Sequence, residues 1–313
     1  MRVLSLFDGI CCGHLALERA GIKIDSYDAY EIEKNAIKAT QANFPDVVHH
    51  GDVTKEDFTK YKGKVDIIIG GFPCMDVSMA GKGAGLKGAR SGLFYEFLRA
   101  MEECKPKYFL VENVVMKKEW EDIITSCLGV EPIEINSSLV SAQNRRRLYW
   151  TNIPNVTLPK DKNITLADIL EDIEFPNPAA IRGRRLNKAT IVGRRLDENG
   201  HRQDYDKTIP ITQCLEVRAS NTDKSNCLTT VDKDNVLTPL PVGRYPDAFK
   251  NNLPFRYYTT KEMCRLQTLP DSFLNMIPDS AARKALGNGW TVNVIAHIFG
   301  FLPEEYKISE EIV

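Results

Sequence analysis

The chain has 313 residues, of which 43% are hydrophobic and 27% charged, and its formal net charge is −1. This composition predicts a globular protein with a sizeable core, folded as about two domains or as one large domain with an insertion. The charge argues against a uniformly basic surface, and without a run of about 18 apolar residues we expect no membrane-spanning helix.

The chain begins with a strand-like segment, residues 3–7, instead of the basic and apolar regions of a secretory signal. We therefore expect a cytoplasmic protein with reduced cysteines. No CxxC pair and no Cys/His cluster with zinc spacing occurs, so we expect no metal site. The eight cysteines are Cys11, Cys12, Cys74, Cys104, Cys127, Cys214, Cys227 and Cys264.

The first half of the chain alternates short apolar strands with helical patterns. In chain order we predict strand 3–7, helix 13–20, strand 24–30, helix 33–43, strand 65–69, helix 93–104, strand 108–111 and a helix near 117–128. This alternation predicts an α/β fold, with a parallel sheet covered by helices on both faces. In such sheets, ligands bind beyond the carboxyl ends of the strands.

The pattern changes after about residue 155, where prolines interrupt the regular elements. Residues 181–258 are polar, with strand-like pieces at 190–192 and 227–231, and they predict a second, smaller, loop-rich domain. Helical patterns return at 260–268 and 281–301. An excess of basic residues between 181 and 202 suits either a nucleic-acid surface or a solvated loop. These residues are Arg182, Arg184, Arg185, Lys188, Arg194, Arg195 and Arg202.

Three polar turns follow the first predicted strands. Phe7-Asp8-Gly9-Ile10 follows the first strand, where a glycine lets the backbone approach a ligand. Glu31 ends the second strand, where a carboxylate can bind a ribose diol. Asp52 could receive an adenine amino group. Each also has a structural interpretation: an ordinary strand–helix turn, a surface glutamate and a turn aspartate.

The sequence Gly70-Gly71-Phe72-Pro73-Cys74 follows the most apolar strand. Its glycines and proline fix a loop that would hold the Cys74 sulfur at the ligand edge of the sheet. A thiol has a pKa near ~8.5 and needs little activation to attack an electron-poor carbon. The glycine-rich stretch 81–92 contains Lys82, Lys87 and Arg90, and it suits a loop that closes over an anionic substrate.

Glu112-Asn113 ends the next strand, so adjacent strand ends would bring Glu112 close to Cys74. A buried glutamate tends to have a raised pKa and can act as an acid. Arg145 and Arg147 would share one face of a strand, where two guanidinium groups could bind a phosphate or orient a base carbonyl.

In this order, the motifs resemble those of the DNA cytosine-5 methyltransferase family along nearly the whole chain. The matching pieces are Leu6-Phe7-Asp8-Gly9-Ile10, Glu31, Asp52, Pro73-Cys74, Glu112-Asn113-Val114, Gln143-x-Arg145-x-Arg147, Arg265-Leu266-Gln267-Thr268-Leu269-Pro270 and Gly287-Asn288-Gly289. The resemblance implies a Rossmann-like S-adenosylmethionine-dependent methyltransferase sheet with a smaller, loop-rich target-recognition domain. It implies that residues 1–178 plus 281–313 form the catalytic and cofactor-binding domain, and residues 179–280 the target-recognition domain.

The resemblance also implies roles for residues. Cys74 would attack C6 of a flipped cytosine in double-stranded DNA, Glu112 would hold a proton at N3, and Arg145 and Arg147 would support the flipped nucleotide. The cofactor would be S-adenosyl-L-methionine, which donates a methyl group to C5. Its expected contacts are Phe7, Gly9, Glu31, Ile32, Asp52, Val53, Phe72, Leu93, Asn288 and Gly289.

Some positions depart from the common family pattern. Cys11 and Cys12 stand in the first glycine-rich motif, Phe72 and Met75 flank the Pro73-Cys74 pair, and many relatives have a serine where Gly289 stands. The variants around the first motif and the cysteine loop are similar to those of the eukaryotic de novo enzymes. The compact chain nevertheless favours a bacterial or phage enzyme, so we expect a monomer that acts in restriction–modification beside a cognate restriction endonuclease.

Three alternatives remain open from the sequence. A tRNA cytosine-5 methyltransferase would keep the chemistry and change the substrate, although the long variable region at 179–258 favours duplex DNA. A catalytically silent DNA-binding homologue would not need Cys74, Glu112, Arg145 and Arg147, all of which are present. A nucleotide-binding sheet protein would use Cys74 only as a structural residue.

Overall fold

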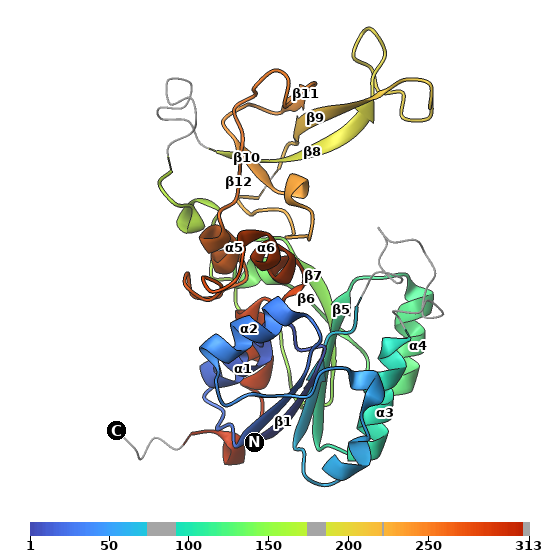
Figure 1. The fold of residues 1–313 in the computed structure, drawn as a ribbon, viewed down its shortest axis with the longest axis vertical. Helices are drawn as coiled ribbons and strands as arrows, with labels where there is room; N and C mark the ends of the chain where they lie inside the picture. Colours follow the sequence, from blue (N-terminus) through green and yellow to red (C-terminus); the bar gives the residue numbers. More distant parts are fainter. Residues whose placement is uncertain (74–91, 174–185, 221, 309–313) are drawn as a thin grey trace.

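The computed structural model describes residues 1–73, 92–173, 186–220 and 222–308. Figure 1 shows a large sheet flanked by helices, with a smaller sheet beyond the carboxyl ends of its parallel strands. The large sheet has seven strands in the order β3-β2-β1-β4-β5-β7-β6. They are β1 (Arg2–Leu6), β2 (Ser26–Tyr30), β3 (Val48–His49), β4 (Ile67–Gly70), β5 (Tyr108–Val114), β6 (Ile133–Asn136) and β7 (Arg146–Thr151).

The predicted α/β fold is confirmed, with one addition. Strands β3, β2, β1, β4 and β5 pair in parallel, as expected. Strand β7 pairs antiparallel with β5 and with β6, an arrangement that the sequence did not indicate. The antiparallel β7 begins at Arg146 and therefore brings the arginine motif to the carboxyl end of β5.

Helices cover both faces of the large sheet, and consecutive apolar side chains of its buried strands point alternately to the two faces. Val3 and Ile67 contribute to the core under α1 (Cys12–Arg19), α2 (Lys34–Asn43) and α7 (Val292–Phe299), whereas Leu4 and Ile68 contribute to the core under α3 (Leu93–Cys104) and α4 (Lys118–Leu128). Figure 1 shows these two layers to the left and right of the sheet. The large sheet is therefore buried on both faces, as is usual for parallel sheets.

The prediction of one continuous helix over 281–301 is wrong, because the chain forms two helices there. Helix α6 (Asp279–Asn288) ends where Gly289 adopts an extended conformation, and α7 begins at Val292. The carbonyl of Gly289 accepts hydrogen bonds from the side chains of Arg145 and Gln267. These tertiary hydrogen bonds stabilise the break, which helical periodicity does not reveal.

The small sheet is antiparallel and has the strand order β11-β9-β8-β10-β12. Its strands are β8 (Asn187–Arg195), β9 (Ile211–Val217), β10 (Val236–Thr238), β11 (Gly243–Tyr245) and β12 (Arg256–Tyr257). The strand-like piece 190–192 lies inside β8, whereas the predicted piece 227–231 is not a strand. In this segment, side chains and not a neighbouring strand bind the backbone. The amide of Leu228 donates to the side chain of Gln143, and its carbonyl accepts from the side chain of Arg145.

The segment that follows β12 and contains α5 packs on the core of the large sheet. Helix α5 (Thr260–Leu266) begins with a capping box formed by Thr259 and Glu262. Met263, Leu266 and Phe273 belong to the same hydrophobic core as α1 and α7. The interval 179–280 therefore contains the small sheet and also a segment of the larger core. In the part of the chain that the structure describes, no helix is long and apolar enough to cross a membrane.

Candidate active site

The carboxyl ends of β1 and β2 are linked by the carboxylate of Glu31. Its Oε2 accepts a hydrogen bond from the amide of Gly9 at 2.8 Å, and its Oε1 accepts one from Ile32 N at 2.7 Å. Gly9 has φ +63°, a conformation that favours glycine, and an added Cβ there would meet no atom within 4 Å. The Ile32 side chain beside them is 72% exposed. An open apolar surface therefore lies next to a fixed carboxylate.

Asp8, in the same turn, points into the protein. Its Oδ1 accepts hydrogen bonds from Ser5 Oγ at 2.6 Å and from the Tyr27 hydroxyl at 2.7 Å. Burial of the carboxyl group raises the pKa of Asp8 to about 6, against these two hydrogen bonds. Asp8 therefore anchors the turn and is not a ligand-facing group.

The next expected cofactor residues line the ends of β3 and β4. Asp52 caps the short helix η1 (Val53–Lys55), because its Oδ1 accepts from Thr54 N at 3.0 Å, which lowers the pKa of Asp52. Val53 and Phe72 are buried in the core under α3, where the Phe72 ring lies 5.2 Å from that of Phe94.

Two further expected contacts come from the far end of the chain. Asn288 ends α6 in an exposed position, and Gly289 follows it. A Cβ added to Gly289 would lie 3.8 Å from both Cys12 Sγ and Ile10 Cδ1. The structure therefore brings the Gly-Asn-Gly segment beside the turn after β1, although about 280 residues separate them in sequence.

The loop after β4 is tied to the end of β5. The side-chain amide of Asn113 donates to the carbonyl of Phe72 at 3.1 Å, and both residues are buried. A Cβ on Gly71 would lie 3.0 Å from Glu112 Oε2, so glycine permits this close approach. Cys74 follows two residues after Phe72 and lies outside the described residues, as do Lys82, Lys87 and Arg90.

Glu112 is 7% exposed, and both of its carboxylate oxygens have partners. Its Oε1 lies 3.0 Å from Arg147 Nε, and its Oε2 accepts a hydrogen bond from the indole Nε1 of Trp290 at 3.0 Å. Three separate parts of the chain, β5, β7 and the turn before α7, therefore meet at one carboxyl group.

The two arginines that the sequence paired have different surroundings. Arg145 is 3% exposed and donates to the carbonyls of Leu228, at 2.9 Å, and Gly289, at 2.8 Å. Arg147 contacts Glu112, and the guanidinium groups of both arginines reach Cys227 Sγ, at 3.3 Å from Arg145 and 3.8 Å from Arg147. Arg145 thus joins backbone segments, while Arg147 lies at the carboxylate.

Sequence reasoning missed three residues of this region. Gln143 donates to Gln267 Oε1 at 2.9 Å, Gln267 donates to Gly289 O at 3.1 Å, and Trp290 binds Glu112. Both glutamines lie inside motifs that the sequence displayed, but a motif does not show that its glutamines bind each other. Trp290 directly follows the Gly-Asn-Gly motif, and nothing in its own sequence position indicated a contact with Glu112.

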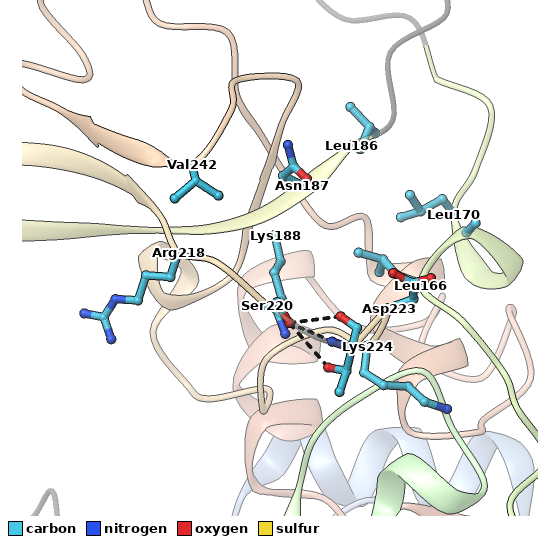
Figure 2. A pocket seen from close by; sticks show the side chains of 12 residues that line it. Leu166, Leu170, Leu186, Asn187, Lys188, Arg218, Ser220, Asp223, Lys224 and Val242 are labelled. Atoms are coloured by element: carbon cyan, nitrogen blue, oxygen red, sulfur yellow. Dashed lines mark hydrogen bonds between the residues drawn. The ribbon is translucent and has the colours of Figure 1, made fainter.

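Two cavities lie away from these strand ends. One, of about 320 Å³, opens between residues 166–170 and the start of β8, and Lys188 and Arg218 line it (Figure 2). The other, of about 730 Å³, is lined by His14, Tyr27 and Ile308 near the amino end of β2. Neither cavity includes the residues expected to carry the chemistry. Within the described ranges, no three His, Cys, Asp or Glu side chains group as metal ligands.

The mostly parallel sheet, with helices on both faces, has the fold of methyltransferases. The sequence model of the C-5 cytosine-specific DNA methylases matches residues 1–122 and 137–303. The chain therefore belongs to the C-5 cytosine-specific DNA methylase family, whose members transfer a methyl group from S-adenosylmethionine to cytosine in DNA.

Named relatives agree with this assignment. The chain is 31% identical to the type II methyltransferase M1.ScrFI of Lactococcus lactis subsp. cremoris, over 94% of this chain and 76% of that one. It is also 31% identical to the type II methyltransferase M.Eco47II of Escherichia coli, over 93% and 76% of the two chains.

Solved structures show the same fold at lower identity. The Entamoeba histolytica methyltransferase EhMeth has a TM-score of 0.69 and 18% identity, with 98% of this chain and 99% of that chain covered. A DNMT2 variant of Spodoptera frugiperda has a TM-score of 0.64 and 19% identity, with 96% and 99% covered.

Proposed function

We propose that this enzyme methylates cytosine in double-stranded DNA through a covalent bond between Cys74 and C6 of the base. The observation that carries the proposal is the bond from Asn113 to the carbonyl of Phe72, because it ties the loop that leads to Cys74 to the strand that carries Glu112. A nucleophile two residues after Phe72 in the sequence and an acid on the neighbouring strand suit addition to a pyrimidine ring.

In this mechanism, the Cys74 sulfur bonds to C6 while Glu112 holds a proton at N3. Protonation draws electron density out of the ring and favours the attack. Arg147, 3.0 Å from Glu112, supplies positive charge beside the extruded base, and Arg145 fixes the backbone around it. Once C5 carries the methyl group, loss of the C5 proton to a base re-forms the C5–C6 double bond, breaks the Cys74–C6 bond, and releases 5-methylcytosine and the cysteine thiolate.

We propose that the cofactor lies over the ends of β1, β2 and β4, against Phe7, Gly9, Glu31, Ile32, Asp52, Val53, Phe72, Leu93, Asn288 and Gly289. The residues fit such a ligand: Glu31 Oε2 accepts one hydrogen bond and keeps a second acceptor position for a ribose hydroxyl. Ile32 offers an exposed apolar side chain for a flat base. When bound, S-adenosyl-L-methionine supplies the methyl group from its sulfonium.

We propose that the interval 179–280 recognises the DNA target, with the small sheet as its centre. One face of that sheet packs on its own core, which includes Ile191 and Leu215. The other face carries Lys188, Arg194 and Arg244, and Arg218 follows at the end of β9. Arg194, Arg218 and Arg244 share the carboxylate of Glu216, so this face keeps an excess of positive charge. Such an excess suits the phosphate backbone of a duplex, whose binding repays the cost of extruding a base.

The type II relatives support a role in restriction–modification. On this proposal the enzyme is a cytoplasmic monomer, and its methylation protects DNA from a cognate restriction endonuclease. Bisulfite sequencing of DNA from cells that express the chain tests whether cytosine in DNA is methylated and whether methylation is confined to one site, because it reports the methylated base and its position. We expect methylcytosine at one short recognition sequence.

The test includes two variants and one alternative substrate. Cys74→Ala and Glu112→Gln should both lose methyl transfer to duplex DNA, Cys74→Ala completely. Methyl transfer to tRNA and none to duplex DNA would replace the proposed substrate. Unchanged transfer by Cys74→Ala would overturn the proposed covalent step.

A further inference from the structure

The indole ring of Trp290 spans the distance between the proposed cofactor edge and the proposed acid. Its Nε1 donates to Glu112 Oε2 at 3.0 Å. At the other end of the ring, a Cβ added to Gly13, in the first turn of α1, would lie 3.6 Å from Trp290 Cζ3. The ring therefore lies between Glu112 and the first turn of α1.

The backbone on both sides of Trp290 is fixed. The carbonyl of Gly289 accepts from Arg145 at 2.8 Å, and the hydroxyl of Thr291 donates to Gln267 Oε1 at 2.8 Å. Thr291 Oγ1 also lies 2.9 Å from Ser137 Oγ, and Thr291 is buried. Such anchoring holds the indole in place before any substrate arrives, so no ordering cost is left for the reaction step.

The indole N–H can donate but cannot accept a hydrogen bond. Glu112 Oε2 therefore accepts from Trp290, and this hydrogen bond fixes the orientation of the carboxyl group, with Oε1 on the side of Arg147. Oε1 lies 3.0 Å from Arg147 Nε. A Cβ on Gly71 would lie 3.0 Å from both Glu112 Oε2 and Trp290 Nε1, so the glycine leaves room for this contact.

We propose that Trp290 is a positioning residue that orients the carboxyl group of Glu112, so that Oε1, on the side of Arg147, faces N3 of cytosine. This proposal rests on the proposed role of Glu112. When the base enters, Oε1 replaces its contact with Arg147 by one with N3, while Oε2 remains bound to the indole. Trp290 thus acts through Glu112 and does not itself take part in bond formation.

The test replaces Trp290 by Phe, which keeps an aromatic ring and removes the donor. We expect kcat to fall by about 10- to 100-fold, because the lost bond is one to a charged group, with little change in KM for S-adenosylmethionine. The pH profile of kcat should shift as well, since the carboxyl group then lacks one of its two partners. Trp290→His keeps an N–H donor and should restore part of the loss.

Trp150→Phe is the matched control, because its indole donates to Thr125 Oγ1 at 2.9 Å on the other face of the sheet. It should lower the melting temperature and leave kcat close to that of the wild type. In the Glu112→Gln background, Trp290→Phe should add little further loss, because the two residues act as one unit.

Two results separate the possible failures. A wild-type kcat and pH profile in Trp290→Phe, or losses that multiply fully with those of Glu112→Gln, would overturn the role of Trp290. A fully active Glu112→Gln variant would instead overturn the proposed role of Glu112.

Discussion

The guanidinium of Arg145 donates to the carbonyl of Gly289 at 2.8 Å, across 144 positions of sequence. It also donates to Gly287 O at 3.2 Å and to Leu228 O at 2.9 Å. One buried side chain thereby joins the arginine motif, the end of α6 and the segment that leads to the small sheet. This arrangement makes the position of Trp290 depend on Arg145.

Replacing Arg145 by Lys should therefore reduce both stability and activity. A lysine has one nitrogen, which cannot reach the separate carbonyls that the planar guanidinium serves. We expect a loss of about 2–4 kcal/mol in the free energy of unfolding, since buried carbonyls lose their donors. Chemical denaturation measures this loss, and methyl transfer measures the effect on kcat.

Arg146→Lys is the neighbouring control. Arg146 is exposed and pairs with Glu134 on the surface, so we expect a change within about 0.5 kcal/mol. Equal losses in both variants would show that the buried contacts of Arg145 contribute nothing specific.

Gly287→Ala should disturb the contact between α6 and the segment before the small sheet. An added Cβ would lie 2.5 Å from the carbonyl oxygen of Thr229 and 2.7 Å from Thr230 N, and backbone atoms cannot rotate away. We expect a destabilisation of about 1–3 kcal/mol, as in other overpacked sites. Ser280→Ala, on an exposed position of α6, should leave thermal unfolding unchanged. A fully stable Gly287→Ala protein would show that the two segments do not touch in solution.

Asn113→Ala should impair catalysis more than stability. It removes the hydrogen bond to Phe72 O, so the loop before Cys74 is held less well, and a misplacement of about 1 Å can cost about 100-fold in rate. The control is Asn152→Ala, because Asn152 binds Phe109 N and Lys107 O, both at 2.9 Å, at the opposite end of β5. We expect Asn152→Ala to lower the melting temperature and keep kcat, and the reverse pattern would contradict the proposed site.

The stability of the small sheet should depend on pH through Glu216. Its carboxylate is buried and accepts hydrogen bonds from Arg194, at 2.8 Å, Arg244, at 2.9 Å, and Arg218, at 3.1 Å. The hydrogen bond from Arg194 is the largest cause that lowers the pKa of Glu216 from 4.5 to about 2. Because the folded pKa is the lower one, this stability is present above pH 4.5 and is lost as pH falls toward 2.

The shift corresponds to about 3 kcal/mol. Denaturation of the wild type and of Glu216→Gln between pH 2.5 and 7 should show a difference that narrows steadily below pH 4.5. Glu134→Gln, which removes an exposed carboxylate, should show a much smaller difference. A difference for Glu216→Gln that is constant over this range would contradict the assignment.

The sequence predicted the first half of the fold well, because its strands are short apolar runs between helical patterns. Helix 93–104 coincides with α3, since Phe94, Phe97, Ala100 and Cys104 follow helical spacing and are all buried. The antiparallel β7 and the break at Gly289 were not predictable in this way, because both depend on partners that are distant in sequence.

The site shows the same limit. Glu31, Glu112 and Arg147 were identified by their positions at strand ends and in motifs, and the structure places Glu112 beside Arg147. Arg145 resembled Arg147 in sequence, but its interior contacts depend on Leu228 and Gly289. Trp290 was missed because its link to the site is one hydrogen bond to Glu112, which lies 178 positions away in the sequence.

The most direct test of the proposed mechanism is to locate the covalent bond to the base. A duplex that carries 5-fluorocytosine at the recognition site cannot lose a proton from C5 after methyl transfer, so the protein–DNA adduct should persist. Mass spectrometry of the digested adduct should place the modified base on the peptide that contains Cys74, and Cys74→Ala should form none. An adduct on another cysteine such as Cys227, or efficient methylation without any adduct, would contradict the account.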